Sequence, residues 1–446
     1  MSRPVMPVLD RVSDMMSTAR GRRREHAEDE IPRQPECAAV AAPSGASLLA
    51  LDWLNFLMAA LLMGFGPFVS LHLADRGWVP SSIGLVLTAG GLAGLLTQIP
   101  AGELIDTIKS KRVLVGIGAV AVVLGLLTLG LRPDFAPVFA AAVAQGMAGS
   151  IIGPGIAAIS LGLVGHDALA GRLGRNQQFA SIGGLTAAGT MGVVGYFLPS
   201  SDIFFLTAAL GLPVLLALGT IRASDIHYAR SCSAVDMHPT HPQRASRATL
   251  MRYHGLLTFA VCLFLFQLAN ASILPLTGQI LAHTKGHLSS LILSGFVVVP
   301  QIIVAVLAPW VAQKAETWGR RPLLLAGLAA LPIRTAFFAL IADPVPLVLV
   351  QALDGLSGAT LGVLTALVIA DLTKGTGRFN LGQGVVGTVS GIGAALSTSV
   401  SGLIVARYGQ MAGLLSVTAI GLLAVAILAT FMPETRSTVA RPLPAV

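Results

Sequence analysis

This 446-residue chain contains few charged residues, few aromatic residues and few cysteines. Only 11% of its residues are Asp, Glu, Lys or Arg, whereas an ordinary soluble domain carries about 25%, so a soluble globular protein is excluded. The three cysteines, Cys37, Cys232 and Cys262, are too widely spaced to indicate a disulfide framework or a zinc site. Apolar residues make up 54% of the chain, and the mean hydropathy is +0.78. These proportions also exclude a disordered chain and predict an all-α membrane protein with many spans.

Long apolar segments predict twelve membrane-spanning helices. One span uses roughly 20 mostly apolar residues, so about 240 apolar residues, 54% of the chain, are enough for twelve spans. Six segments precede a polar stretch in the middle of the chain, at 47–72, 80–105, 112–131, 136–164, 176–199 and 202–221. Six more follow it, at 255–282, 289–313, 321–342, 344–371, 380–406 and 411–432.

Basic residues gather in alternate loops, which predicts the orientation of the chain. Lys and Arg collect in the cytoplasmic loops of membrane proteins. With the N-terminus placed in the cytoplasm, 24 of the 29 basic residues lie on the cytoplasmic side and 4 on the opposite side, while Arg334 lies inside a span. We therefore expect both termini to be cytoplasmic, in a bacterial-type inner (plasma) membrane. This topology accounts for the net charge of +8, so no nucleic-acid partner is expected.

Polar regions divide the chain into two six-span halves. We predict a disordered cytoplasmic tail at 1–46, an N-terminal half at 47–221, a cytoplasmic middle loop at 222–254, a C-terminal half at 255–432 and a cytoplasmic C-terminal tail at 433–446. The first tail holds seven basic and seven acidic residues, so it is interpreted as a solvated segment rather than a cleaved leader. The halves repeat each other in register: Gln145–Gly149 matches Asp354–Gly358, Gly171-Arg172 matches Gly377-Arg378, and Arg76-Gly77 matches Lys285-Gly286.

Each half also carries a copy of one loop signature. The first copy, after span 2, consists of Gly102, Asp106, Lys109, Lys111 and Arg112, and the second, after span 8, of Ala312, Glu316, Gly319, Arg320 and Arg321. This duplicated arrangement resembles the major facilitator superfamily, whose signature is a glycine, an aspartate four residues on, and then a glycine and two basic residues. Lys109, Ala312 and Glu316 depart from that pattern, but the spacing is kept. The resemblance covers about residues 47–432 and implies two six-helix halves around a central cavity that is lined by helices 1, 4, 7 and 10.

The loop signature has two interpretations. Asp106 can accept backbone N–H groups at the N-terminus of a neighbouring helix or pair with the basic residues of its loop. Such contacts would hold one side of the protein closed and would break during alternating access. Alternatively, the basic residues only set the topology and attract anionic lipid headgroups.

Asp354 is the most notable polar residue at membrane depth. Span 10 begins near Pro344, and ten residues at about 1.5 Å each place Asp354 about 15 Å deep, near the midplane. In the resembled fold it would face the central cavity together with its repeat mate Gln145. Burial favours the protonated form of a carboxyl group, which suits a group that takes up and releases a proton. The alternative is a structural Asp bonded to backbone or to Gln351.

Other polar residues in the spans have two interpretations as well. Arg334, in span 9, either snorkels outward or pairs with Asp354. Asp52 and Asn55, near the start of span 1, either lie at the membrane interface or belong to the substrate and proton cavity, where Asp52 is the alternative proton carrier to Asp354. Gln267 and Asn270 in span 7 either bind substrate or hold helices together.

These features predict a secondary transporter rather than an enzyme. The chain has no phosphate-binding loop, no cofactor motif and no metal-ligand spacing. We expect alternating access of a small-molecule substrate, a proton as coupling ion, a monomer in the lipid bilayer, and a preference for export by antiport. Uptake by symport and uncoupled transport stay open, as does a non-transporting receptor that signals through its tails.

Overall fold

The computed structural model describes residues 43–64, 69, 72–73, 76–108, 110–197, 199–226, 254–273, 288–341, 343–374, 376 and 378–436. All regular secondary structure in these residues is helical. Most of the predicted N-terminal tail and middle loop, the end of the C-terminal tail and Lys109 lie outside the described residues.

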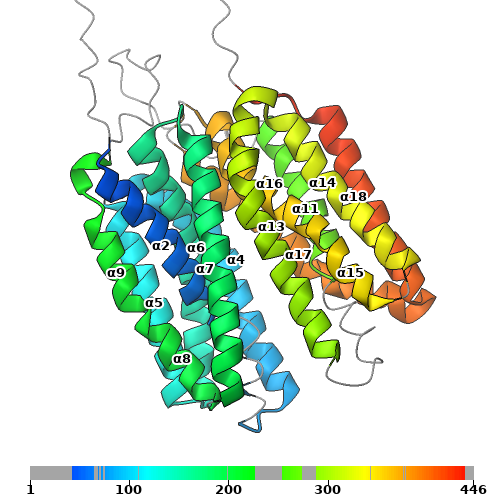
Figure 1. Ribbon diagram of the computed structural model, residues 1–446, viewed down its shortest axis with the longest axis horizontal. Helices are drawn as coiled ribbons and strands as arrows, with labels where there is room; N and C mark the ends of the chain where they lie inside the picture. The colour runs from blue at the N-terminus through cyan, green and yellow to red at the C-terminus, as the bar shows by residue number, and fades with distance from the viewer. Residues whose placement is uncertain are drawn as a thin grey trace, which may run out of the picture. The chain divides into compact units, whose positions relative to one another are not determined.

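The N-terminal half consists of helices that follow one another through short turns (Figure 1). They are α2 (Gly45–Met63), α4 (Pro80–Thr107), α5 (Lys111–Leu131), α6 (Phe135–Val164), α7 (Leu169–Phe197), α8 (Ser200–Ala209) and α9 (Gly211–Thr220), followed by the short 3-10 helix η1 (Ala223–Asp225). The helix of span 6 is interrupted between α8 and α9. Pro213 explains this break, because proline has no N–H to donate to the carbonyl of Ala209.

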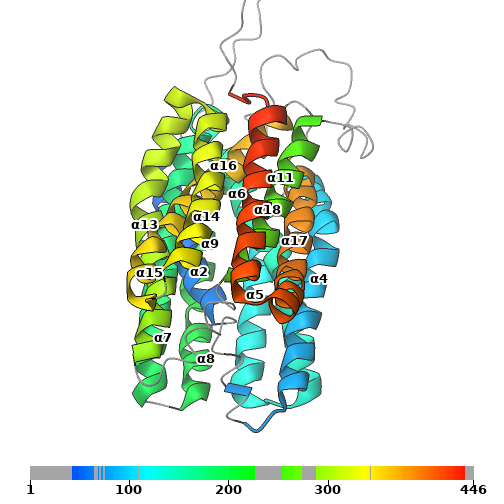
Figure 2. The ribbon, with the colours of Figure 1, turned by 90° about the vertical axis from the view of Figure 1, so that its right-hand side faces the viewer.

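The C-terminal half repeats this arrangement. Its helices are α11 (His254–Asn270), α13 (Leu288–Trp318), α14 (Arg320–Leu340), α15 (Pro344–Val350), α16 (Ala352–Leu372), α17 (Phe379–Tyr408) and α18 (Gln410–Phe431). Figure 2 shows α18 between α14 and α11, and it contacts both. A second helix break lies at Gln351, between α15 and α16, in span 10. It is not the repeat of the α8–α9 break, because the counterpart of span 6 in the second half is span 12.

Each predicted span overlaps one of these helical stretches. Ten stretches are long and apolar enough to cross a membrane, and α7 and α11 supply the two remaining predicted spans. The boundary of span 5 was misplaced, because α7 begins at Leu169 rather than at residue 176. Arg172 and Arg175, which were assigned to a loop, therefore lie on a helix.

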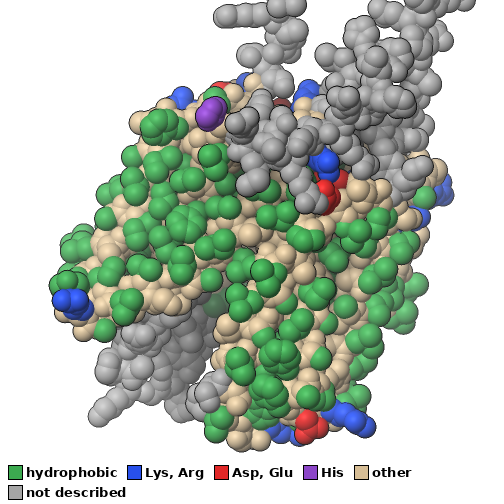
Figure 3. Space-filling model, turned by 180° about the vertical axis from the view of Figure 1, so that it is seen from behind, with side chains coloured by type: hydrophobic (Ala, Val, Ile, Leu, Met, Phe, Trp, Pro, Cys, Tyr) green, Lys and Arg blue, Asp and Glu red, His purple; other side chains and the backbone are tan. Residues whose placement is uncertain are grey.

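One apolar core lies within the N-terminal half, and a second fills the C-terminal half and extends onto α6 and α7. Residues such as Leu51, Val115 and Leu126 form the core of the N-terminal half, and Phe259 and Leu324 belong to that of the C-terminal half. Apolar side chains also cover the outside: Figure 3 shows them over the middle of the back face, with charged side chains gathered toward its ends. An apolar exterior between charged ends is the surface that a bilayer requires.

Glycines allow α4 and α6 to pack with their backbones in close contact. A Cβ atom added at Gly146 would lie closer than 3.0 Å to the carbonyl group of Gly90, and one at Gly90 would meet the carbonyl group of Ala142. Small residues at such contacts let membrane helices approach closely and gain van der Waals contact. The glycine-rich segment of α6 therefore determines how α4 lies against it.

The two halves contact each other at one end of the bundle. We call this end the signature side, because both loop signatures, at 106–112 and 316–321, lie there. On this side α4 packs on α17 and α7 packs on α13, and a Cβ atom added at Gly102 or Gly174 would overlap the opposite half. Farther from the signature side, Cβ atoms at Gly91 of α4 and Gly402 of α17 would meet nothing within 4 Å.

Asp225 connects the start of α2 to the segment after α9. Its carboxylate accepts hydrogen bonds from the hydroxyl groups of Ser44, at 2.6 Å, and Ser47, at 2.7 Å. These two hydroxyl groups stabilise the charged form and lower the pKa of Asp225 from 3.8 to about 2. Ser44 also caps the N-terminus of α2. The carboxylate of Asp225 therefore holds the capped start of α2 against the segment that follows α9.

Replacing Gly146 by Ala should destabilise the fold by about 1–3 kcal/mol, because the added methyl group overlaps the backbone of Gly90. The melting temperature of the purified protein in detergent measures this effect. Gly153→Ala on the same helix is the matched control, since its Cβ atom would meet nothing within 4 Å. Equal melting temperatures for the two variants would contradict this packing.

Acidification should remove the stabilising contribution of Asp225. Because the pKa is lower in the folded chain than the ordinary 3.8, the contribution is present above pH 3.8 and is lost as the pH falls toward 2. The difference in melting temperature between wild type and Asp225→Asn should be largest near neutral pH and should shrink below pH 3.8. A difference that grows on acidification would contradict the assigned contacts.

Candidate functional site

A cavity of about 370 Å³ lies between the two halves. Residues of α4, α6, α11, α16 and α17 line it. Nine of its fifteen lining residues are apolar or glycine, and the six polar ones carry only amide or hydroxyl groups: Gln98, Ser150, Gln267, Thr365, Gln383 and Ser390. The cavity is therefore uncharged and partly apolar.

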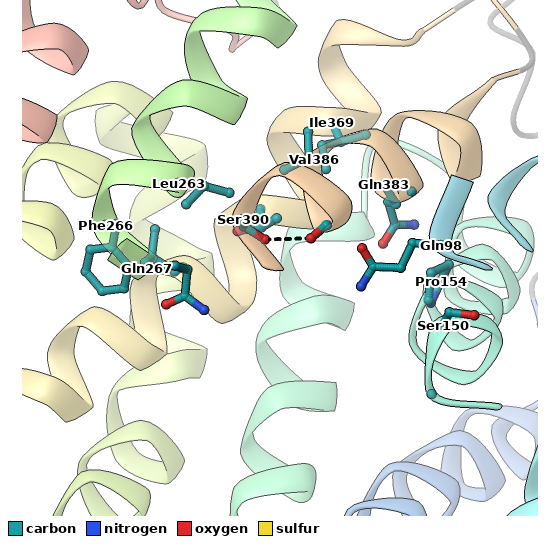
Figure 4. Close-up of a pocket in the computed structure, with 15 residues that line it drawn as sticks. Gln98, Ser150, Pro154, Leu263, Phe266, Gln267, Ile369, Gln383, Val386 and Ser390 are labelled. Atoms are coloured by element: carbon teal, nitrogen blue, oxygen red, sulfur yellow. Dashed lines mark hydrogen bonds between the residues drawn. The ribbon is translucent and has the colours of Figure 1, made fainter. Parts of the chain in front are cut away.

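The glutamines of the cavity come from both halves. Figure 4 shows Gln98 of α4 and Gln383 of α17 pointing toward each other, with Gln267 of α11 on the far side of Ser390. The Oε1 atom of Gln98 is buried and has no hydrogen-bond partner among the described residues. The Nε2 atom of Gln383 donates to Oδ1 of Asn380 at 3.5 Å, so this side of the cavity adjoins the start of α17.

Asp354 and Gln145 do not line this cavity, contrary to the expectation from the repeat. Gln145 faces a separate cavity of about 50 Å³ in the N-terminal half. The large cavity begins one turn farther along α6, at Gly149, and two turns farther along α16, at Leu361. The resemblance correctly predicted that spans 4, 7 and 10 line the cavity, but α2 of span 1 does not line it, whereas α4 of span 2 and α17 of span 11 do. The expected depth of Asp354 and Gln145 also placed the cavity too far from the signature side. Among the candidates, Gln267 does line it.

Arg334 is buried and makes an ion pair with Asp354. Its side chain is 3% exposed, whereas that of Asp354 is 28% exposed. The guanidinium group also donates to Oε1 of Gln351 at 3.3 Å and to Oδ1 of Asn270. The outward snorkelling considered for Arg334 is therefore wrong, and the alternative of pairing with Asp354 is confirmed. The cluster joins α14 to α16, to the α15–α16 turn and to the end of α11.

Asp52 is likewise buried rather than at the membrane interface. It forms ion pairs with Arg172 and, at 2.8 Å, with Arg175, and 2% of its side chain is exposed. Arg172 also donates to Asn176 at 2.8 Å. Asn55 is buried and donates to the backbone carbonyl of Leu51 at 2.8 Å, within its own helix. Interface snorkelling was wrong for Asp52 because α7 begins early enough to bring two arginines to it.

The first loop signature bridges the halves. The carboxylate of Asp106 accepts the backbone N–H groups of Asn380, at 3.1 Å, and Leu381, at 2.9 Å, and the side-chain amide of Asn380 at 2.7 Å. A carboxylate at the N-terminus of α17 also interacts favourably with the helix dipole. Glu103 adds a second bridge, to Arg378 at 3.5 Å. The predicted contact between Asp106 and a helix N-terminus is confirmed, and Gly102 is required because Asn380 lies against it.

Arg112 of the first signature contacts its own half. Arg112 donates to the backbone carbonyl of Ile221. Lys111 is in the first turn of α5. Lys109 lies outside the described residues, so its predicted role stays a prediction.

The charged residues of the second loop signature pair within the C-terminal half, whereas Ala312 lies against Gly174 of α7. Glu316 pairs with Arg320 one turn away, at 3.1 Å, and Arg320 also pairs with Asp371 of α16 at 3.1 Å. The backbone N–H groups of Arg320 and Arg321 donate to the carboxylate of Glu434, at 2.8 and 3.0 Å.

Glu434 and Gly319 complete this second signature. Burial raises the pKa of Glu434, but hydrogen bonds from three backbone N–H groups outweigh it and lower that pKa overall. Gly319 has φ +92°, a conformation that favours glycine. An added Cβ atom there would also lie within 3 Å of Glu434. The C-terminal segment that carries Glu434 therefore packs against this loop.

Two cavity residues were missed by the sequence analysis although a signal existed. Gln98 and Gln383 are amides inside the predicted spans 80–105 and 380–406, the same criterion that selected Gln267. By contrast, no sequence signal pointed to Arg172 and Arg175 as partners of Asp52, because that pairing depends on how α2 and α7 pack.

Comparisons with known proteins agree with this architecture. The sequence matches the Major Facilitator Superfamily over residues 51–331 and 259–446. Two relatives, described as uncharacterized MFS-type transporters of two strains of Mycobacterium tuberculosis, are each 37% identical over 394 residues, which covers 86% of this chain and 93% of the relative.

A solved structure has the same fold. The proton:xylose symporter XylE bound to 6-bromo-6-deoxy-D-glucose aligns with a TM-score of 0.68 at 14% identity, over 87% of this chain and 96% of XylE. This likeness confirms the predicted all-α fold with two six-helix halves. The family match confirms the resemblance seen in the loop signatures. The chain therefore belongs to the major facilitator superfamily and is a multi-pass membrane transporter, not an enzyme.

Proposed function

We propose that this protein is a proton-coupled secondary transporter in which Asp354 takes up and releases the proton. The Arg334–Asp354 ion pair carries the proposal. The guanidinium group is almost fully buried, while more than a quarter of the carboxyl side chain is exposed, so the carboxyl is the member of the pair that water can reach. Protonation of Asp354 would leave Arg334 as a buried charge without a counter-charge, which is costly in an apolar environment.

The proton site and the cavity share two helices. On α16, Leu361 follows Asp354 by seven residues, and Thr365 follows Leu361 by four. These spacings place all three on one face of the helix. Asn270, a partner of Arg334, lies three residues after the cavity residue Gln267 on α11. A rearrangement of Arg334 on protonation would therefore move helices that line the cavity, which is the physical requirement for coupling.

The contacts between the halves support one state of an alternating-access cycle. The halves meet on the signature side, through Asp106 and α17, whereas Cβ atoms added farther from it, at Gly91 or Gly402, would meet nothing within 4 Å. The distribution of basic residues assigns the signature side to the cytoplasm. The described conformation then corresponds to a cavity that is closed toward the cytoplasm, with both termini on the cytoplasmic side.

A proton gradient can drive such a cycle. One proton that crosses the membrane yields roughly 2.3 kcal/mol per 100 mV and about 1.4 kcal/mol per pH unit. For the direction of transport, we keep the expectation of export by antiport. In this direction, solute entry at the cytoplasmic face follows release of the proton there.

Asp354→Asn should abolish proton movement coupled to solute. Proteoliposomes that enclose a pH-sensitive dye are challenged with a mixed library of solutes. Wild type should show a solute-dependent pH change, and the variant should show none because Asn does not titrate. The sign of the change in wild type distinguishes antiport from symport. Equal signals in both proteins would make Asp354 a structural residue.

A double variant separates titration from folding. Asp354→Asn alone leaves Arg334 without its counter-charge and should cost about 3 kcal/mol or less, because Asp354 is partly exposed. Arg334→Gln combined with Asp354→Asn removes both charges, so it should melt closer to wild type. It should still show no proton coupling.

Asp106→Asn should open the signature side. Hydrogen bonds to a charged group contribute about 1.5–3 kcal/mol, so the loss of the carboxylate should shift the equilibrium between closed and open states about tenfold or more. Spin labels at Thr107 of α4 and Trp318 of α13, both exposed, measure the distance between the halves in a cysteine-free background. Glu316→Gln is the control, since among the described residues Glu316 pairs within its own half. A longer distance in both variants would contradict the assignment.

A further inference from the structure

We infer that the cavity between the halves selects uncharged solutes rich in hydrogen-bond donors, such as hydroxyl or amide N–H groups, and that Gln98 determines this specificity. The inference rests on the proposed role of the cavity as the solute site. Three features carry it: the absence of charge, the hydroxyl and amide oxygen atoms that can accept further hydrogen bonds, and the place of Gln98 between the halves.

The cavity has no group that can compensate a charged solute. None of its fifteen lining residues is ionisable. The carboxylates on the lining helices already have partners: Asp106 binds the start of α17, Asp354 binds Arg334 and Asp371 binds Arg320. Moving a permanent charge from water into such a site has a large desolvation cost, and no opposite charge in the cavity offsets it. An uncharged solute is therefore favoured.

Two hydroxyl groups of the cavity can only accept further hydrogen bonds, and Gln98 adds an acceptor without a partner among the described residues. The hydroxyl groups of Ser150 and Ser390 donate their hydrogens to the backbone carbonyls of Met147, at 2.7 Å, and Gly387, at 3.0 Å. Each hydroxyl then offers the cavity its oxygen lone pairs. The unpartnered Oε1 atom of Gln98 is a third acceptor. Because a buried acceptor without a partner is costly, a solute that brings donors is favoured over one that brings only acceptors.

Gln98 lies where the solute would touch both halves. It belongs to α4, but a Cβ atom added at Gly387 of α17 would lie 2.9 Å from its Oε1 atom, and one at Gly384 would lie 2.5 Å from its backbone oxygen. Figure 4 shows its side chain directed toward Gln383 of α17. A donor bound to Gln98 is therefore held beside the opposite half.

Matched probes test the selectivity of the purified full-length protein. The first set is D-glucose, D-gluconate and D-glucosamine, and the second is benzamide, benzoate, benzylamine and N,N-dimethylbenzamide, at a pH at which the amines are protonated. The apparent dissociation constant of each probe is obtained from the concentration dependence of the melting temperature. At least one uncharged donor-bearing probe should bind about tenfold more tightly than its charged analogues, and benzamide more tightly than its donor-free dimethyl derivative.

Variants test the role of Gln98. Gln98→Leu should weaken the best uncharged probe about tenfold, the loss expected for one hydrogen bond. Gly387→Ala should weaken it as well, because the new methyl group displaces the Gln98 amide. Leu96→Ala is the control, since Leu96 lies on the same helix with 76% of its surface exposed, and it should bind like wild type. The melting temperature without probe verifies that each variant is folded.

Each result decides between the proposals. Equal or tighter binding of the charged analogues, no stabilisation by any uncharged probe, or unchanged binding in Gln98→Leu would overturn the inference. If a charged solute moves protons in wild-type vesicles but not in Asp354→Asn, the proposed function stands and the inference fails. If uncharged probes bind through Gln98 but nothing moves protons, the inference stands and the proton coupling fails.

Discussion

The cost of burying charge in an apolar environment is the constraint on which this structure depends. Only 11% of the residues are charged, and three carboxylates inside the helical bundle have defined partners. Asp52 has two arginines, Asp354 has Arg334, and Asp106 has the N-terminus of α17. Each of these contacts joins different helices, so satisfying the charge also determines which helices lie together. Glycines such as Gly102 and Gly146 make the required close approach possible.

The two halves use the same signature differently. In the first copy, Asp106 crosses the junction and closes the signature side. In the second, Glu316 turns back to Arg320, and the carboxylate that caps the neighbouring helix α14 is Glu434, from the C-terminal segment. Sequence symmetry therefore does not produce symmetric contacts. The polar contacts of Asp106 in the N-terminal copy cross between the halves, while the polar contacts of the C-terminal copy stabilise its own half.

Short paths connect the cavity to both charge sites. Gln383 of the cavity bonds to Asn380, whose side-chain amide bonds to Asp106. On the other side, α16 carries Asp354 about 16 Å along the helix from the cavity residue Thr365, at 1.5 Å per residue. The cavity, the carboxyl group of Asp354 and the signature side thus lie on shared helices. Because of this arrangement, the proposed coupling between proton and solute needs no long-range pathway through the protein.

The sequence by itself determined the membrane class, the twelve spans and the two-half organisation, and it offered the contact of Asp106 with a helix N-terminus as one of its interpretations. Hydropathy and loop spacing are local properties of the chain, and they need no knowledge of how the helices are rotated. The tertiary structure alone decided that Arg334 pairs with Asp354, that Asp52 is buried between two arginines, and that Gln98 rather than Gln145 lines the large cavity. These outcomes depend on the rotation and depth of each helix against its neighbours. Backbone contacts at glycines set both, and one or two helical turns are enough to move a side chain out of a cavity.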